Sequence, residues 1–140
     1  MKNAIPSKCT ILYVEDDADD VFLFERSLKK AKVPCEVQNV SSLVDAEAYL
    51  GGLGPYADRA RFPLPHLIIT DLAFRGASGF DFISWLRSQS ALKCIPVICV
   101  TGSDDPRKLQ QARGFGVSCV GKTSLFREAV DVVQQILAAS

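Results

Sequence analysis

Residues 10–17 read TILYVEDD, an apolar run that ends in three acids. We expect a strand over the apolar part, from Thr10 to Val14. A helical pattern follows, because Val21, Phe24 and Leu28 recur at the spacing of one helix face. The same alternation of a short apolar run with an amphipathic segment continues to the end of the chain, and it is the signature of a parallel α/β sheet.

Five strands and five helices in strict alternation predict a doubly wound α/β domain with a five-stranded parallel sheet. We expect one domain over residues 1–140, with an ordered core from about residue 8 to 138 and no output domain. The expected strands are Thr10–Val14, Glu36–Val40, Leu67–Thr70, Pro96–Val100 and Cys119–Val120. The expected helices are Asp19–Ala31, Leu43–Leu50, Phe80–Arg87, Pro106–Phe115 and Ser124–Ala138.

The residues between these elements favour the predicted helix starts at two points. Ser42 is a good cap for the second helix, and Pro106 suits a first helical turn. The Gly- and Pro-rich connection from Gly51 to Pro65 is long for a compact domain. Such a connection is either functional or poorly ordered, and the sequence does not choose between the two.

Composition excludes several classes of protein. Lys plus Arg equal Asp plus Glu at 16 each, so the chain lacks the basic footprint of a nucleic-acid binder. It has neither a signal-peptide pattern nor an apolar run long enough to span a membrane, and we expect a cytoplasmic protein. The five cysteines form no Cys-x-x-Cys pair. We expect Cys9, Cys99 and Cys119 to be small buried apolar residues in a reducing compartment.

Acids, a hydroxyl and a lysine stand at the carboxyl ends of four predicted strands. Glu15 and Asp16 follow the first strand, Asp71 follows the third, Thr101 the fourth and Lys122 the fifth. Chemistry in an open parallel sheet takes place at these ends. Two carboxylates ~4 Å apart repel by about 4 kcal/mol at an effective dielectric constant of about 20. A Mg²⁺ ion relieves this repulsion, because it binds carboxylates and phosphate oxygens together.

With a metal ion nearby, Asp71 is the natural nucleophile for a phosphoryl group, and its product is an acyl phosphate. Lys122 supplies a further positive charge and the Thr101 hydroxyl can donate to a phosphate oxygen. A single acid after a strand is more often a helix cap, a role we expect for Asp17 or Asp19. Chemistry at Asp71 is favoured because acids, a hydroxyl and a lysine occur together at the ends of four strands.

The chain resembles the receiver domains of response regulators over essentially its whole length. The motifs that carry the resemblance are VEDD at 14–17, IITDL at 68–72, Gly79, Thr101-Gly102 and Lys122. The resemblance implies a flavodoxin-like sheet with strand order 2-1-3-4-5. It also implies a two-component regulator that accepts a phosphoryl group from a sensor histidine kinase or a phosphotransfer protein, and that switches the binding of a downstream partner.

The resemblance also implies the roles of individual residues. Asp71 is the phosphoacceptor and ligates Mg²⁺ together with Asp16. The backbone carbonyl of Ala73 completes the protein ligands, and Glu15 acts through water.

Around the phosphoryl group, the resemblance implies that Thr101 and Lys122 bind it and that Gly102 leaves room beside it. It further implies a regulatory protein rather than an enzyme, one that promotes its own phosphoryl transfer. We expect slow autodephosphorylation, because Ala73 and Ser103 stand where fast receivers position the attacking water.

Within the family, the chain is most similar to small single-domain receivers that partner phytochrome-type and related kinases. Three positions depart from the family pattern. Arg75 and Thr123 stand where prolines are usual, and Cys119 stands at the position of the aromatic switch residue. These departures put a ring-flip version of the switch in doubt, but not phosphorylation.

The first expected helix also suggests a docking surface. Phe22 and Leu23 lie beside a core stripe that is already complete, which indicates either a kinase-docking patch or a wide face buried under the last helix. The sequence names neither the downstream target nor the oligomeric state, so a homodimer of the phosphorylated form stays open.

Three other functions compete with this interpretation. A haloacid-dehalogenase-like phosphatase would need a second acid where Ala73 stands. A flavin-binding flavodoxin-like protein would need a phosphate loop that is missing. A phosphorylation-independent pseudo-receiver, acting as a binding module, is the main alternative.

Overall fold

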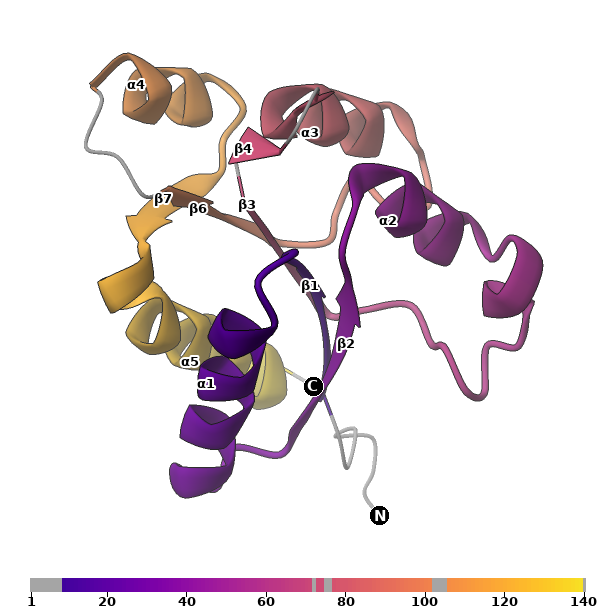
Figure 1. The fold of residues 1–140 in the computed structure, drawn as a ribbon, viewed down its shortest axis with the longest axis vertical. Helices are drawn as coiled ribbons and strands as arrows, with labels where there is room; N and C mark the ends of the chain where they lie inside the picture. The colour runs from indigo at the N-terminus through magenta and orange to yellow at the C-terminus, as the bar shows by residue number, and fades with distance from the viewer. Residues whose placement is uncertain (1–8, 72, 75–76, 102–105, 140) are drawn as a thin grey trace.

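The computed structural model describes residues 9–71, 73–74, 77–101 and 106–139, and its centre is a five-stranded parallel sheet (Figure 1). The order of the strands is β2-β1-β3-β6-β7, which confirms the expected order 2-1-3-4-5 when the strands of this sheet alone are counted. These strands are β1 (Cys9–Val14), β2 (Cys35–Val40), β3 (Leu67–Asp71), β6 (Val97–Thr101) and β7 (Ser118–Gly121).

A short hairpin that the sequence did not predict follows β3. Strands β4 (Ala73–Phe74) and β5 (Ala77–Ser78) pair with each other in antiparallel fashion and stay outside the main sheet. Strands of only two residues carry no period that a sequence pattern could reveal.

Helices cover both faces of the sheet (Figure 1). Helices α1 and α5 lie on one face, and α2, α3 and α4 lie on the other. The five helices are α1 (Ala18–Lys30), α2 (Leu43–Gly51), α3 (Gly79–Ser88), α4 (Pro106–Gly114) and α5 (Lys122–Ala139). A 3₁₀ turn, η1 (Gly54–Ala57), follows α2.

The side chains of the central strands alternate between two buried clusters. Along β1, Leu12 and Val14 pack with α2 and α3, whereas Ile11 and Tyr13 pack with α1 and α5. A strand that is buried on both faces consists of a continuous run of apolar residues, which is why the central strands can be predicted from the sequence.

The caps expected from the sequence form. The Oδ1 atom of Asp17 accepts hydrogen bonds from the N–H groups of Asp19 and Asp20 at 2.9 and 3.3 Å, so α1 starts at Ala18. The Ser42 hydroxyl accepts from the N–H of Asp45 at 3.1 Å and caps α2. Each cap satisfies backbone donors that the first turn of a helix leaves unpaired.

Two of the expected cysteine positions are confirmed as core positions. Cys9 and Cys99 are fully buried, and Cys119 is half-buried. Burial raises the pKa of Cys99 to about 12, so this thiol keeps its proton at neutral pH.

The connection between α2 and β3 is packed rather than loose. The guanidinium of Arg59 donates to the carbonyls of Tyr49 and Leu50 at 2.8 Å each and to that of Phe62 at 3.1 Å. It therefore satisfies carbonyl groups at the end of α2, which the helix itself leaves unpaired. The rings of Tyr49, Tyr56 and Phe62 contact one another with centroids 5.2–6.0 Å apart.

We predict that Arg59→Ala lowers the free energy of unfolding by about 2–4 kcal/mol, because hydrogen bonds from a charged donor contribute more than neutral ones. Urea denaturation measures this loss. Arg61→Ala is the matched control, since Arg61 is exposed and its guanidinium only covers the ring of Phe62 at 5.3 Å. The control should lose less than about 1 kcal/mol. Equal losses in the two variants would contradict a capping role for Arg59.

Candidate functional site

The carboxyl ends of β1 and β3 meet where the direction of strand addition reverses. On one side of β1 lies β2, which is reached through α1, and on its other side lies β3, which is reached through α2 on the opposite face of the sheet. Crossover connections on opposite faces leave a crevice at such a point, and α/β proteins bind their ligands there.

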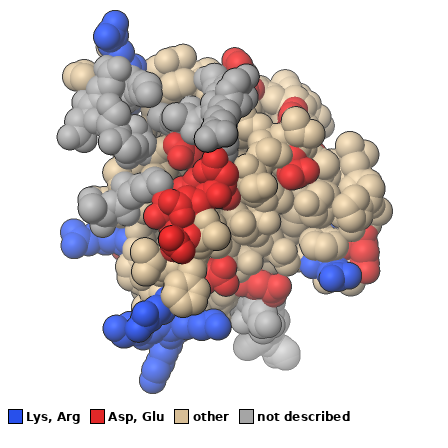
Figure 2. All heavy atoms as spheres, viewed as in Figure 1, with Lys and Arg blue, Asp and Glu red and all other residues tan. Residues whose placement is uncertain are grey.

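The structure brings the predicted acids to this crevice. Val14 of β1 pairs with Thr70 of β3, so the next residues, Glu15 and Asp71, leave neighbouring strands at the same level. Asp16 follows Glu15 and is exposed, whereas Asp71 is half-buried. In Figure 2, acidic side chains gather in the middle of the view, over the start of α1, and the described Lys and Arg side chains lie toward its edges.

Glu15 is the most buried of these acids. Its side chain is only 2% exposed, and its Oε2 atom accepts a hydrogen bond from the N–H of Asp16 at 3.1 Å. The N–H of Glu15 in turn donates to the carbonyl of Val40 on β2 at 3.0 Å. A buried carboxylate requires compensation by donors or by a cation, because burial removes its hydration.

The other predicted phosphate-site residues lie at the same edge of the sheet. Asp71 pairs with Val100, and Thr101, the last residue of β6, pairs with Gly121 of β7. Lys122 follows Gly121 and is the first residue of α5. The backbone therefore aligns the three predicted positions, while the side chains of Thr101 and Lys122, and the whole of Gly102, lie outside the described residues.

The donors at this edge fit a hard cation. Asp16 and Asp71 are the two carboxylates predicted to bind directly, and Ala73, in β4, is the source of the predicted carbonyl ligand. Mg²⁺ is bound through one or two carboxylates and keeps several waters. In the described parts of the chain, no group of three or more His, Cys, Asp or Glu side chains is close enough to hold a metal ion. The predicted set does not require such a group, because its third protein ligand is a backbone oxygen.

Sequence reasoning missed one residue beside the acids. Asn39, on β2, donates from its side-chain amide to the carbonyls of Tyr13 and Glu15. The only signal in the sequence was a polar residue next to the end of a short strand, and such residues are common on exposed edge strands.

Comparison with known families decides the class of this protein. The sequence model of the response regulator receiver domain matches residues 11–133. The chain belongs to the response regulator receiver family.

Relatives of this receiver domain include response regulators of a plant and of a cyanobacterium. Two-component response regulator ARR9 of Arabidopsis thaliana is 30% identical over 123 residues, which cover 79% of this chain and 51% of ARR9. The receiver domain thus spans about half the length of this plant relative. Response regulator Rcp1 of Synechocystis sp. (strain ATCC 27184 / PCC 6803 / Kazusa) is 28% identical over 127 residues, which cover 90% of this chain and 84% of Rcp1.

Solved structures resemble the receiver domain as a whole. The phosphorylated cyanobacterial phytochrome response regulator RcpA has a TM-score of 0.78 and 27% identity, with 95% of this chain and 96% of that chain covered. The bacteriophytochrome response regulator AtBRR has a TM-score of 0.77 and 26% identity, with 94% of each chain covered. The Mn²⁺-bound form of Rcp1 has a TM-score of 0.72 and 26% identity, with 93% and 90% covered.

The three departures from the receiver pattern have different outcomes. Thr123 lies in the first turn of α5, which starts at Lys122. Cys119 is half-buried in β7 opposite Cys99, and burial raises its pKa. Its place as the switch position stays a prediction, and Arg75 lies outside the described residues.

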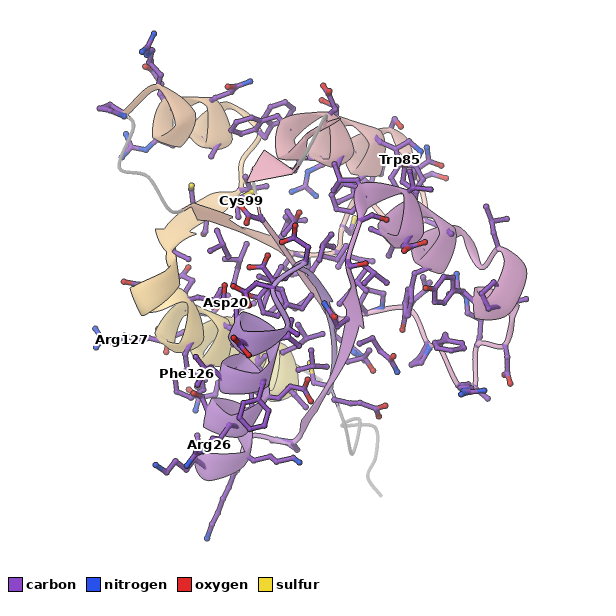
Figure 3. All side chains as sticks on the ribbon, viewed as in Figure 1. Asp20, Arg26, Trp85, Cys99, Phe126 and Arg127 are labelled. Atoms are coloured by element: carbon purple, nitrogen blue, oxygen red, sulfur yellow. The ribbon has the colours of Figure 1, made fainter. Side chains whose placement is uncertain are left out.

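The structure excludes one of the two interpretations of the first helix of the receiver domain, and docking through this helix stays a prediction. Phe22 is 61% exposed and Leu23 is 56% exposed, so neither is buried under α5. Leu23 lines a groove of about 140 Å³ between α1 and α5, together with Phe126. Figure 3 shows Phe126 on α5 beside α1, with Asp20 near the start of α1.

None of the described helices is both long and apolar enough to cross a membrane.

Proposed function

We propose that this receiver domain accepts a phosphoryl group on Asp71 and switches the binding of a partner protein in a two-component pathway. The observation that carries the proposal is the register of β1 and β3. Asp71 is half-buried at the carboxyl end of β3, and Glu15 and Asp16 follow the end of the neighbouring strand β1, which supports a shared site at the crevice.

The chemistry at Asp71 is a displacement at phosphorus. A carboxylate oxygen of Asp71 forms the new bond to phosphorus, and the bond from phosphorus to the donor breaks, which is a P–N bond when the donor is a phosphohistidine. The leaving imidazole nitrogen keeps the electron pair of that bond and takes a proton. Lys122 and Thr101 are proposed to bind the oxygens of the phosphoryl group, so the protein acts mainly by positioning and charge neutralisation.

The proposed cofactor is Mg²⁺, held by Asp16, by Asp71 and by the carbonyl of Ala73, with Glu15 acting through water. When bound, the cation neutralises the acids and binds phosphate oxygens, which a cluster of carboxylates would otherwise repel. The Mn²⁺-bound form of the related Rcp1 supports a divalent cation in this fold.

The proposed donor is a sensor histidine kinase or a phosphotransfer protein. The phytochrome response regulators among the similar structures favour a phytochrome-type kinase. We place the reaction in the cytoplasm, with which the five free cysteines agree. We also propose that the phosphoryl group is lost slowly, so that the signal lasts long.

Incubation with Mg²⁺ and acetyl phosphate, followed by the intact mass of the protein, tests the proposal. We expect a stable adduct of one phosphoryl group, which does not form when EDTA is present during the incubation. Continuous release of phosphate without an adduct would indicate a phosphatase. The absence of both would favour the phosphorylation-independent pseudo-receiver.

For donor recognition, we predict that Leu23→Lys slows phosphotransfer from the cognate kinase at least about tenfold, because a charged group cannot enter an apolar contact without losing its hydration. Phosphorylation by acetyl phosphate, which needs no docking surface, should stay unchanged. Val44→Lys is the matched control, since Val44 is 74% exposed on α2. Docking through α1 is excluded if Leu23→Lys and Val44→Lys accept phosphoryl groups from the kinase equally fast.

For the lifetime of the phosphorylated form, we predict that Ala73→Asn combined with Ser103→Glu accelerates decay about ten- to a hundredfold. Hydrolysis needs an oriented water, and one positioning contact contributes roughly 1.4–2.7 kcal/mol to the barrier. Ala73 offers that water no side-chain hydrogen bond, while Ser103 lies outside the described residues. Phosphoprotein is followed after rapid removal of the donor. Decay of the wild type within seconds would show that another group positions the water.

A further inference from the structure

The carboxyl end of β1 is tied to the edge strand β2 by more than the backbone ladder. The ladder itself ends at the pair Val14 and Val40, followed by the hydrogen bond from the N–H of Glu15 to the carbonyl of Val40. Beyond this point the chain turns into α1, whose cap is Asp17. The acids Glu15 and Asp16 therefore stand on a three-residue bridge, residues 15–17, between the end of β1 and the start of α1.

The side chain of Asn39 reaches over this bridge. Its Nδ2 atom lies 2.9 Å from the carbonyl oxygen of Tyr13, 3.1 Å from that of Glu15 and 3.2 Å from that of Val40. These distances are those of N–H···O hydrogen bonds, and the two amide hydrogens are shared among three acceptors. One side chain thus binds both strands and the first residue of the bridge.

The contact to the carbonyl of Glu15 bears on the acids directly. The peptide unit of that carbonyl links Glu15 to Asp16, and its N–H, on Asp16, donates to the carboxylate of Glu15 at 3.1 Å. Asn39 therefore binds the carbonyl oxygen of this peptide group, and the N–H of the same group orients the buried carboxylate of Glu15. A change at Asn39 would therefore act on the backbone of Glu15 and of Asp16 together.

We propose that Asn39 is a positioning residue that fixes the backbone of the acid pair and thereby sets the affinity of the site for Mg²⁺. The inference rests on the proposed function, because it takes Asp16 and Glu15 as the metal-binding acids. Groups that orient metal ligands from behind typically contribute ten- to a hundredfold in metal affinity. The physical reason is that a ligand held in place loses little freedom on binding.

The test is a calorimetric titration of the full chain with MgCl₂, below the melting temperature of every variant measured in EDTA. We expect Asn39→Ala to bind Mg²⁺ about tenfold more weakly or worse. Asn39→Ser keeps one hydrogen-bond donor, so its affinity for Mg²⁺ should lie between those of Asn39→Ala and the wild type. This variant replaces Asn39→Ala in the test if the alanine variant does not fold. Gln38→Ala is the control, since the Gln38 amide contacts Glu36 and the carbonyl of Arg61 instead.

A second readout separates positioning from general stability. The rate of phosphorylation by acetyl phosphate is measured against Mg²⁺ concentration, and for Asn39→Ala we expect a higher half-saturating concentration with the wild-type rate at saturation. If the variant binds Mg²⁺ within twofold of the wild type, whatever its melting temperature, Asn39 is only structural and the inference is overturned. If the wild type itself binds no Mg²⁺, the metal site of the proposed function fails, and this inference fails with it.

Discussion

Asp71→Asn is expected to abolish the acceptance of a phosphoryl group. The substitution replaces the nucleophilic carboxylate by an amide of nearly the same size, so it removes the reaction rather than slowing it. The fold should tolerate the change, because Asp71 is half-buried at the last position of β3 and its backbone pairing with Val100 is independent of the side chain.

The measurement is the intact mass after incubation with acetyl phosphate and Mg²⁺, with a thermal melt to confirm folding. Asp45→Asn is the matched control, since Asp45 is an exposed acid in the first turn of α2. The control should accept the phosphoryl group as the wild type does. An adduct of the same size on folded Asp71→Asn would show that another residue is the acceptor.

Asp16→Asn is expected to weaken Mg²⁺ binding by about a hundredfold or more. The substitution removes one of the two carboxylates proposed to bind the cation directly. A hundredfold loss corresponds to about 2.7 kcal/mol, which is below the roughly 4 kcal/mol by which two close unit charges interact at an effective dielectric constant of 20. Calorimetric titration with MgCl₂ measures the change.

Asp17→Asn is the matched control for the effect of charge alone. Asp17 is the next residue in the same bridge, and its side chain already accepts two backbone hydrogen bonds as the cap of α1. Asparagine caps helices about as well as aspartate, so this control removes a nearby charge while the helix stays capped. It should weaken Mg²⁺ binding only a few-fold, because solvent screens exposed charges. Equal losses at the two positions would mean that Asp16 acts through its charge and not as a ligand.

The sequence predicted the fold because the central strands are buried on both faces. The runs before Glu15 and Asp71 are fully apolar or nearly so, and their ends marked the edge of the sheet where the acids lie. The predicted ends fell short by one residue at Asp71 and at Thr101. Both residues continue the hydrogen-bonded ladder, with Val100 and Gly121 as partners, and backbone pairing does not depend on apolar side chains.

Contacts between side chains and distant carbonyls could not be predicted in this way. Arg59 and Asn39 read as ordinary polar residues of a loop and an edge strand, since nothing in a local pattern shows which carbonyl groups lie within reach. The exposure of Phe22 was partly predictable, because helical periodicity placed it off the core stripe. The position of α5 was needed to show that this helix does not cover Phe22.

The position of the phosphoryl group tests the central claim most directly. An acyl phosphate on an aspartate is cleaved by hydroxylamine, whereas phosphate esters of serine, threonine and tyrosine resist it. Wild-type protein is phosphorylated with acetyl phosphate and Mg²⁺, treated with hydroxylamine and mapped by peptide mass. The account predicts a single hydroxamate at Asp71 and none in a sample prepared with EDTA. A hydroxamate at another acid, or a phosphoryl group that resists hydroxylamine, would contradict it.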